Sequence, residues 1–264
     1  MLGAVTGVGI WFTVGLVHPK ATSTLIQVFV WAWAIEWVFF FVEIAAAMVY
    51  YYGWDRLSPR RHLTVGWIYF VAGWMSLFVI NGILTFMLTP GRWLETRSLT
   101  DGLFNPTFWP SLVGRTLVAV GLAGIYALFT SSFLKDLELK KRIARYSATR
   151  WVLPAALLLP FSLAWYLAAA QSAGVPVALI LGSKGSGFFS MLSAILMRSS
   201  DTGAPNAQTA ALISLGACIL IVGLTVTLAV LFTRHLRPVV AGTLLLCGLA
   251  AFGGSEWVRE GLRK

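Results

Sequence analysis

The chain has 264 residues, of which 58% are hydrophobic and only 11% are charged, and its mean hydropathy is +0.80. A soluble domain carries about 25% charged residues, so this composition excludes a soluble enzyme and indicates an integral membrane protein. The net charge of +10 is concentrated in short segments between apolar stretches, which excludes a nucleic-acid-binding surface as its explanation.

Seven apolar stretches predict transmembrane helices, because each is near the roughly 20 residues that a helix needs to cross a bilayer. We expect an all-α integral membrane protein, a bundle of about seven transmembrane helices in a single membrane domain. That domain would have a first half, residues 1–134, and a second half, residues 135–264. A signal peptide is not expected, because the first stretch lacks a positively charged leader. The expected spans are residues 2–17, 25–52, 64–88, 112–134, 151–170, 210–232 and 239–258.

Two glutamates, Glu36 and Glu43, lie in the middle of the second span. A carboxylate at that depth costs a few kcal/mol or more, so intramembrane acids usually serve a function. Residues seven positions apart return to one helix face and lie about 10 Å apart along its axis. We expect the pair to form steps of a proton path or to flank a buried cofactor, with Asn81 on the next span as a hydrogen-bond partner. The alternative is that both acids only hydrogen-bond to adjacent helices.

Positive charge follows the second, fourth and sixth spans. The positive-inside rule assigns such connections to the cytoplasm. The N-terminus is then cytoplasmic, and the C-terminus lies on the outer side of the membrane. The densest connection, residues 135–150, is interpreted as a loop that faces the anionic lipids of its leaflet. The basic residues concerned are Arg56, Arg60 and Arg61, then Lys135, Lys140, Lys141, Arg142, Arg145 and Arg150, and finally Arg234 and Arg237.

The connections on the opposite side have a different character. Residues 89–111 contain three prolines and four aromatic residues, and we expect them to lie across the outer membrane surface as an interfacial cover. Residues 171–209 hold apolar runs that are too short to span, so a re-entrant pair and a surface amphipathic segment both remain open. The stretch Gly182–Gly187 lacks the residue order of a P-loop and predicts a flexible connection.

Cysteine and histidine positions limit which cofactors the chain can bind. Cys218 and Cys247 lie in apolar runs and no Cys-x-x-Cys-His sequence exists, so neither a c-type haem nor a cysteine metal site is expected. The histidines His18, His62 and His235 all lie at predicted span ends. A bis-histidine b haem needs its ligands on facing helices inside the membrane. No metal site is therefore predicted.

Short motifs along the chain carry a family resemblance. They are Gly7–Ile10, Ala34–Glu43, Gly53–Leu57, Ser76–Gly82, Thr89–Pro90, Asn105–Pro106, Arg115–Ala119 and the tail Glu256–Arg263. Together they resemble subunit I of the cytochrome bd quinol oxidases, most closely over residues 5–135. The resemblance implies a membrane subunit of a respiratory complex that works with haem and quinol. It also implies a cytoplasmic position for residues 53–57, in agreement with the charge distribution.

The chain departs from that family pattern at several positions. The family has a preceding span with a haem-ligating histidine, and this chain starts after it. A histidine that ligates the family's low-spin haem is replaced by Arg115, whose guanidinium offers no lone pair, and its methionine partner has no counterpart in residues 210–222. The family's long quinol-binding loop is shortened to residues 171–209. The glutamates are spaced by seven rather than eight, so the correspondence is closer for Glu36 than for Glu43. We expect no low-spin b haem on this chain.

Two functions from different classes fit these observations. The first is a quinol-oxidising subunit, inactive alone, that binds quinol or quinone and passes electrons to or from haem in partner subunits, while protons move along the two glutamates. The alternative is a cofactor-free structural anchor or proton conduit. Either function needs other membrane subunits and cytochromes as partners, and small-residue runs at 121–124 and 248–251 suit close helix contacts. The residues expected to contact quinol or a partner's haem are Arg115, Asn81, His18 and Glu260.

Overall fold

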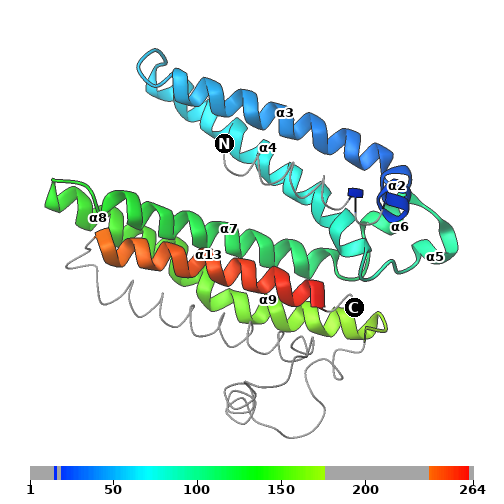
Figure 1. Cartoon of the computed structure of the whole chain (residues 1–264). Coiled ribbons are helices and arrows are strands. Elements are labelled where there is room, and N and C mark those ends of the chain that lie inside the picture. Colours follow the sequence, from blue (N-terminus) through cyan, green and yellow to red (C-terminus); the bar gives the residue numbers. More distant parts are fainter. Residues whose placement is uncertain (1–14, 17–18, 176–237, 262–264) are drawn as a thin grey trace, which may run out of the picture. The chain divides into compact units, whose positions relative to one another are not determined.

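The computed structural model describes residues 15–16, 19–175 and 238–261, which are drawn as coloured ribbons in Figure 1. Every regular element among these residues is a helix. The chain divides into two compact units, residues 1–108 and residues 109–264, and each is described by itself. The expected spans 2–17 and 210–232 lie outside the described residues, apart from the short pieces at 15 and 16.

Four helices of the described part are long and apolar enough to cross a membrane. They are α3 (Val30–Tyr52), α4 (Pro59–Phe86), α7 (Phe108–Ser131) and one continuous helix over Leu137–Ser172. A further helix, α13 (Pro238–Gly261), covers the last expected span. These elements confirm an all-α integral membrane protein.

The second expected span is not one uninterrupted helix. It consists of the end of α2 (Pro19–Val28) and of α3, which are separated at Phe29, where the backbone turns to φ −111° and ψ 26°. The Phe29 side chain is completely buried, and its ring meets the edge of the Phe86 ring at a centroid distance of 4.8 Å. The span predicted over residues 25–52 is thus helical on both sides of Phe29, where a tertiary contact accompanies the local distortion.

Helices α3 and α4 form an antiparallel hairpin (Figure 1). Helix α4 begins five residues before the predicted span, because Ser58 is extended and Pro59, with its fixed φ, suits the first helical turn. The turn between the helices requires Gly53: a Cβ there would lie 2.5 Å from the Val49 carbonyl oxygen. The hairpin is therefore set by local signals at both of its inner ends.

The connection after α4 folds back onto the end of that helix through α5 (Trp93–Thr96) and α6 (Leu99–Leu103). Its anchor is the buried Asn105, whose Nδ2 donates to the Gly82 carbonyl at 3.1 Å and to Thr85 Oγ1 at 2.9 Å. Gly82 permits this approach, because a Cβ there would lie 2.5 Å from a methyl carbon of Leu103. Residues 87–107 are thus tied to α4 by buried polar bonds.

In the second unit, α7 packs against α9 (Leu153–Ser172) and α13 through its small residues. A Cβ built on Gly124 would lie 2.8 Å from Val152 Cγ2, and one on Gly121 would lie 3.4 Å from Ala155 Cβ. On α13, Gly248 lies against the side chains of α7 in the same way. The predicted close helix contact is thus present at Gly121, Gly124 and Gly248.

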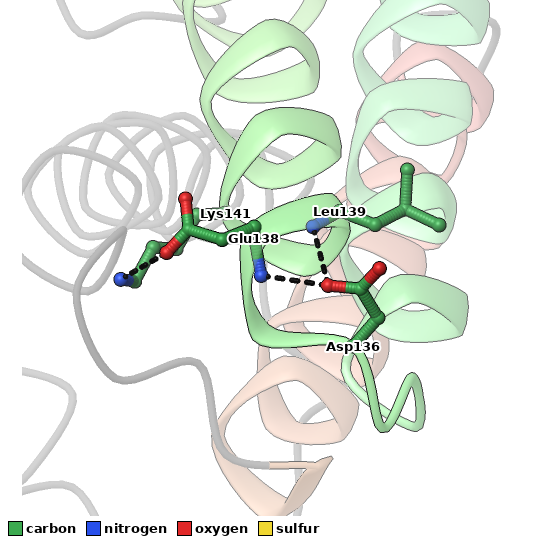
Figure 2. Close-up of polar contacts among 4 residues, drawn as sticks. All are labelled: Asp136, Glu138, Leu139 and Lys141. Carbon is green, nitrogen blue, oxygen red and sulfur yellow. Dashed lines mark hydrogen bonds and ion pairs between the residues drawn. The ribbon is translucent and has the colours of Figure 1, made fainter.

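The basic connection 135–150, which we interpreted as a loop, is largely helical. It forms α8 (Leu137–Ser147), which continues through a π-helical turn, η1 (Ala148–Val152), into α9. Asp136 caps α8, because its Oδ1 accepts from the backbone N–H groups of Glu138 at 2.9 Å and Leu139 at 3.1 Å, as Figure 2 shows. Such a cap satisfies otherwise unpaired donors of the first turn. The prediction of a loop relied on the high charge of this segment and is wrong.

Candidate functional site

The two intramembrane glutamates belong to a regular contact between α3 and α4. We call this contact the α3–α4 seam and define it by Phe29, Glu36, Glu43 and Tyr50, which are spaced by seven residues. A seven-residue repeat keeps one stripe of a helix against a packed neighbour. Each member has an identified contact on α4, and these contacts run in the antiparallel sense.

Glu36 is held by a serine of the neighbouring helix. The Ser76 hydroxyl donates to Glu36 Oε1 at 2.7 Å, and the two residues are forty positions apart in the sequence. Ser76 is buried and Glu36 is half-buried. A hydroxyl both donates and accepts, so Ser76 can fix the carboxyl group while keeping a second hydrogen bond available.

Glu43 lies against a glycine of α4. A Cβ built on Gly73 would meet the Glu43 carboxyl carbon and Oε1 at 3.3 Å each. That separation is shorter than most contacts of real Cβ atoms, so the missing side chain of Gly73 is what makes room for the carboxyl group. Tyr69, one turn away on α4, interacts electrostatically with Glu43.

Both glutamates therefore face α4 at half-buried positions. Their contacts on α4, Tyr69, Gly73 and Ser76, recur at steps of four and three residues and so occupy one face of that helix. The geometry agrees with the expectation that the two acids share one polar face directed at another helix.

The seam ends in an aromatic cluster at the hairpin turn. His62 Nε2 lies 2.9 Å from the Tyr50 carbonyl oxygen, and since a carbonyl only accepts, Nε2 carries the proton. The His62 ring packs against the rings of Tyr50 at 4.0 Å and Trp54 at 4.7 Å. Gly66 lets the Tyr50 ring approach, because a Cβ there would lie 3.2 Å from it.

Asn81, predicted as a partner of the glutamates and as a quinol contact, lies farther along α4. It is completely buried, and its Nδ2 donates to the Phe108 carbonyl at 3.0 Å. The Thr85 hydroxyl donates in turn to the Asn81 carbonyl at 2.8 Å. Asn81 thus contributes to the buried polar group that anchors residues 87–107.

The structure describes the remaining predicted site residues in different degrees of detail. Arg115 is half-buried in the second turn of α7. Glu260 is described only as a backbone position in the last turn of α13. His18 lies outside the described residues.

The family resemblance implies haem ligation by histidine, and among the described residues this directs attention to His62. Within residues 15–16, 19–175 and 238–249, whose side chains are described apart from residue 21, no three His, Cys, Asp or Glu side chains converge in a way that could hold a metal ion. The histidine in this part of the chain is His62, whose Nε2 is engaged and whose ring is covered by Tyr50 and Trp54.

Sequence reasoning identified the acids but missed the residues that hold them. Ser76, Gly73 and Tyr69 gave a usable signal: their spacing matches the heptad of Glu36 and Glu43 on the preceding helix. The sequence could not predict which of these residues meet the two glutamates, because small and polar residues occur on several faces of α4. Only the packed hairpin shows which of them meet the carboxyl groups.

Comparison with known proteins places the chain in a family. Residues 1–177, more than half of the chain, match the family model described as cytochrome bd terminal oxidase subunit I. The matched part contains α3, α4, α7 and α9, and with them both glutamates. No curated protein matches the chain.

Proposed function

The chain belongs to the cytochrome bd terminal oxidase subunit I family, and on that premise we propose that it acts within a respiratory complex in quinol or quinone binding and in proton transfer. In this proposal, Glu36 and Glu43 carry protons, and haem-containing partner subunits exchange the electrons. The observation that carries the proposal is the α3–α4 seam, in which Ser76 holds Glu36 and Gly73 makes room for Glu43.

The seam supports proton movement by its chemistry and its spacing. Carboxyl groups bind and release protons, and the Ser76 hydroxyl can pass a proton as well as fix Glu36. The two glutamates are about 10 Å apart along the helix, which exceeds the roughly 2.7 Å of one O–H···O hydrogen bond. Transfer between them therefore requires bridging water or polar groups along the face of α4.

We place the subunit in a bacterial inner membrane, with the N-terminus cytoplasmic and the C-terminus periplasmic. The exposed arginines of the α3–α4 turn and of α8 support this orientation, because basic connections stay on the cytoplasmic side. The α3–α4 turn, with Tyr50 and His62, then marks the cytoplasmic end of the seam.

Quinol contact is assigned to Arg115, together with His18, Asn81 and Glu260. Arg115 has the strongest chemical case, because its guanidinium stays charged and donates in a planar fork to quinone oxygens or to acidic groups. Asn81 has a weaker case, since its amide already donates to the Phe108 carbonyl. We expect the subunit to be inactive without its partners.

The primary test replaces each glutamate in the assembled complex. Proton-transfer groups contribute about 10²–10⁴-fold to rates, so Glu36→Gln and Glu43→Gln are expected to slow quinol-driven proton uptake by at least about tenfold. Glu95→Gln is the matched control, because it removes the same charge from an exposed position on α5. Uptake is measured with a pH-sensitive dye in proteoliposomes. Full uptake after both replacements would contradict the proposal.

A second test alters the room for Glu43 and leaves both acids in place. Gly73→Ala adds a Cβ at 3.3 Å from the carboxyl group, which must move, and we expect proton uptake to fall as it does in Glu43→Gln. Gly121→Ala is the control, since its Cβ would make an ordinary 3.4 Å contact in α7. Equal uptake by both variants would show that the position of Glu43 is unimportant.

The alternative function, a cofactor-free structural anchor or proton conduit, predicts different results. An anchor tolerates Glu36→Gln, Glu43→Gln and Arg115→Gln, provided that the complex still assembles. Quinol affinity, measured from the substrate dependence of turnover, separates a conduit from a quinol-binding subunit. The quinol-binding assignment requires Arg115→Gln to raise the half-saturating quinol concentration, and a conduit requires no change.

A further inference from the structure

Contacts between α7 and the helix that follows it show how deep the basic residues of α8 lie in the membrane. Gly114 meets Ser162, Gly121 meets Ala155, and Gly124 meets Val152 and Trp151. Each step forward along α7 thus corresponds to an equal step back along α9. The contacts describe a constant antiparallel register over most of the length of α7.

Further contacts join α8 to the end of α7. Lys140 Nζ donates to the Ser132 carbonyl at 2.8 Å, just beyond the last residue of α7. Ala144 of α8 lies in one buried cluster with Leu128 and Ile125. Arg145 is therefore near the level of the C-terminal end of α7, and Arg150 lies roughly 7 Å deeper along the axis at 1.5 Å per residue.

These levels coincide with the boundary of a bilayer. Helix α7 has 24 residues and is about 36 Å long, slightly more than the roughly 30 Å hydrocarbon thickness. The continuous helix from Leu137 has 36 residues and is about 54 Å long, so its first turns project past the hydrocarbon. Arg142 and Arg145 then fall near the level of lipid phosphates, and the long side chain of Arg150, whose backbone is deeper, can extend along the helix toward the same level.

The three arginines share the outward side of this segment. Ala144 and Ser147, on the opposite side of α8, are buried, whereas Arg142, Arg145 and Arg150 are exposed. Between Arg145 and Arg150, η1 closes with an i→i+5 hydrogen bond from Leu153 N–H to the Ala148 carbonyl, a single wide turn within an otherwise α-helical segment.

The aromatic residues beside these arginines are typical of a membrane interface. Tyr146 and Trp151 flank them and are 59% and 39% exposed, as aromatic residues at headgroup depth commonly are. The carboxylate on α8, that of Glu138, forms an ion pair with Lys141 at 3.0 Å (Figure 2). Among the described residues, no carboxylate lies within ion-pair distance of the three guanidinium groups.

We propose that Arg142, Arg145 and Arg150 form a binding site for the phosphate group of an anionic phospholipid at the α8–η1 surface. A guanidinium fork matches phosphate geometry through paired hydrogen bonds. The exposed Tyr146 and Trp151 rings offer apolar contact for the glycerol and upper acyl region of the same lipid. The site is independent of the proposed proton path, which lies in the other unit of the chain.

The test measures lipid retention by the purified complex. Complexes are equilibrated in mixed detergent micelles with increasing phosphatidylglycerol, and bound lipid is counted by native mass spectrometry. Each basic residue near an anionic surface contributes about 1 kcal/mol, or about fivefold in affinity. We expect Arg145→Gln to weaken phosphatidylglycerol binding about fivefold and the triple Arg142→Gln, Arg145→Gln, Arg150→Gln variant about a hundredfold.

Two controls separate a defined site from general electrostatics. The triple variant Arg56→Gln, Arg60→Gln, Arg61→Gln removes the same charge from the α3–α4 turn and is expected to leave the affinity within about twofold of the unchanged complex. Replacing Arg142, Arg145 and Arg150 by lysine keeps the charge but removes the paired hydrogen bonds, so this variant is expected to bind more weakly than the unchanged complex and more tightly than the glutamine triple. The lysine variant also controls for misfolding of the glutamine triple. Equal losses in both glutamine triples, unchanged retention, or loss of a co-purifying protein in place of lipid would each overturn the proposal.

Discussion

The hydrogen bond between Ser76 and Glu36 makes a quantitative prediction about the seam. Ser76→Ala removes the hydroxyl that donates to Glu36 Oε1 at 2.7 Å and leaves the carboxyl group without this donor. Removing one partner of a buried hydrogen bond costs about 1–3 kcal/mol in proteins generally. Side-chain bonds between transmembrane helices are weaker, about 0.6 kcal/mol on average and about 1.7 at most. We therefore expect a coupling free energy between Ser76 and Glu36 of about 0.6–1.7 kcal/mol.

A double-mutant cycle measures this coupling. The variants Ser76→Ala, Glu36→Ala and the double are compared in the free energy of unfolding, determined by titrating denaturing detergent into mixed micelles. Ser131→Ala is the matched control, because Ser131 is also buried but its hydroxyl donates to the Leu128 carbonyl of its own helix. The cycle of Ser131→Ala with Glu36→Ala should give no coupling. A Ser76–Glu36 coupling below about 0.3 kcal/mol, the usual error of additivity, would refute the assignment of the seam.

Other predictions concern packing, the anchored connection and the α8 cap. Gly124→Ala places a Cβ 2.8 Å from Val152 Cγ2 and should lower the free energy of unfolding by about 1–3 kcal/mol, whereas Gly121→Ala, with a 3.4 Å contact, should cost less; equal effects would contradict the α7–α9 register. Asn105→Ala removes the buried donor to two groups of α4 and should cost about 1–3 kcal/mol while exposing residues 87–107 to limited proteolysis; unchanged protease resistance would count against the anchor. Asp136→Ala should weaken the first turn of α8 by about 1 kcal/mol, seen as faster amide hydrogen exchange at its first residues, and unchanged exchange would show that the cap is dispensable.

Features that depend on residues close in sequence were predictable. Apolar length sets α3, α4, α7 and the later helices, because a bilayer demands about 20 apolar residues whatever the neighbours are. The shared face of Glu36 and Glu43 follows from helical periodicity alone. The sequence interpretation failed where local and compositional signals disagreed, as in residues 135–150, whose charge indicated a loop although the Asp136 cap begins a helix there.

The partners of the glutamates were decided only by the tertiary structure. Which residues of α4 meet Glu36 and Glu43 depends on the register of the hairpin, and that register is set by distant contacts: Phe29 against Phe86 at one end and Tyr50 against Gly66 at the other. Likewise, the sequence shows that α8 carries arginines, but their depth in the membrane follows from the glycine contacts between α7 and α9. In both cases, a one-residue shift between helices would rotate different side chains into contact, and no local property of either helix fixes that shift.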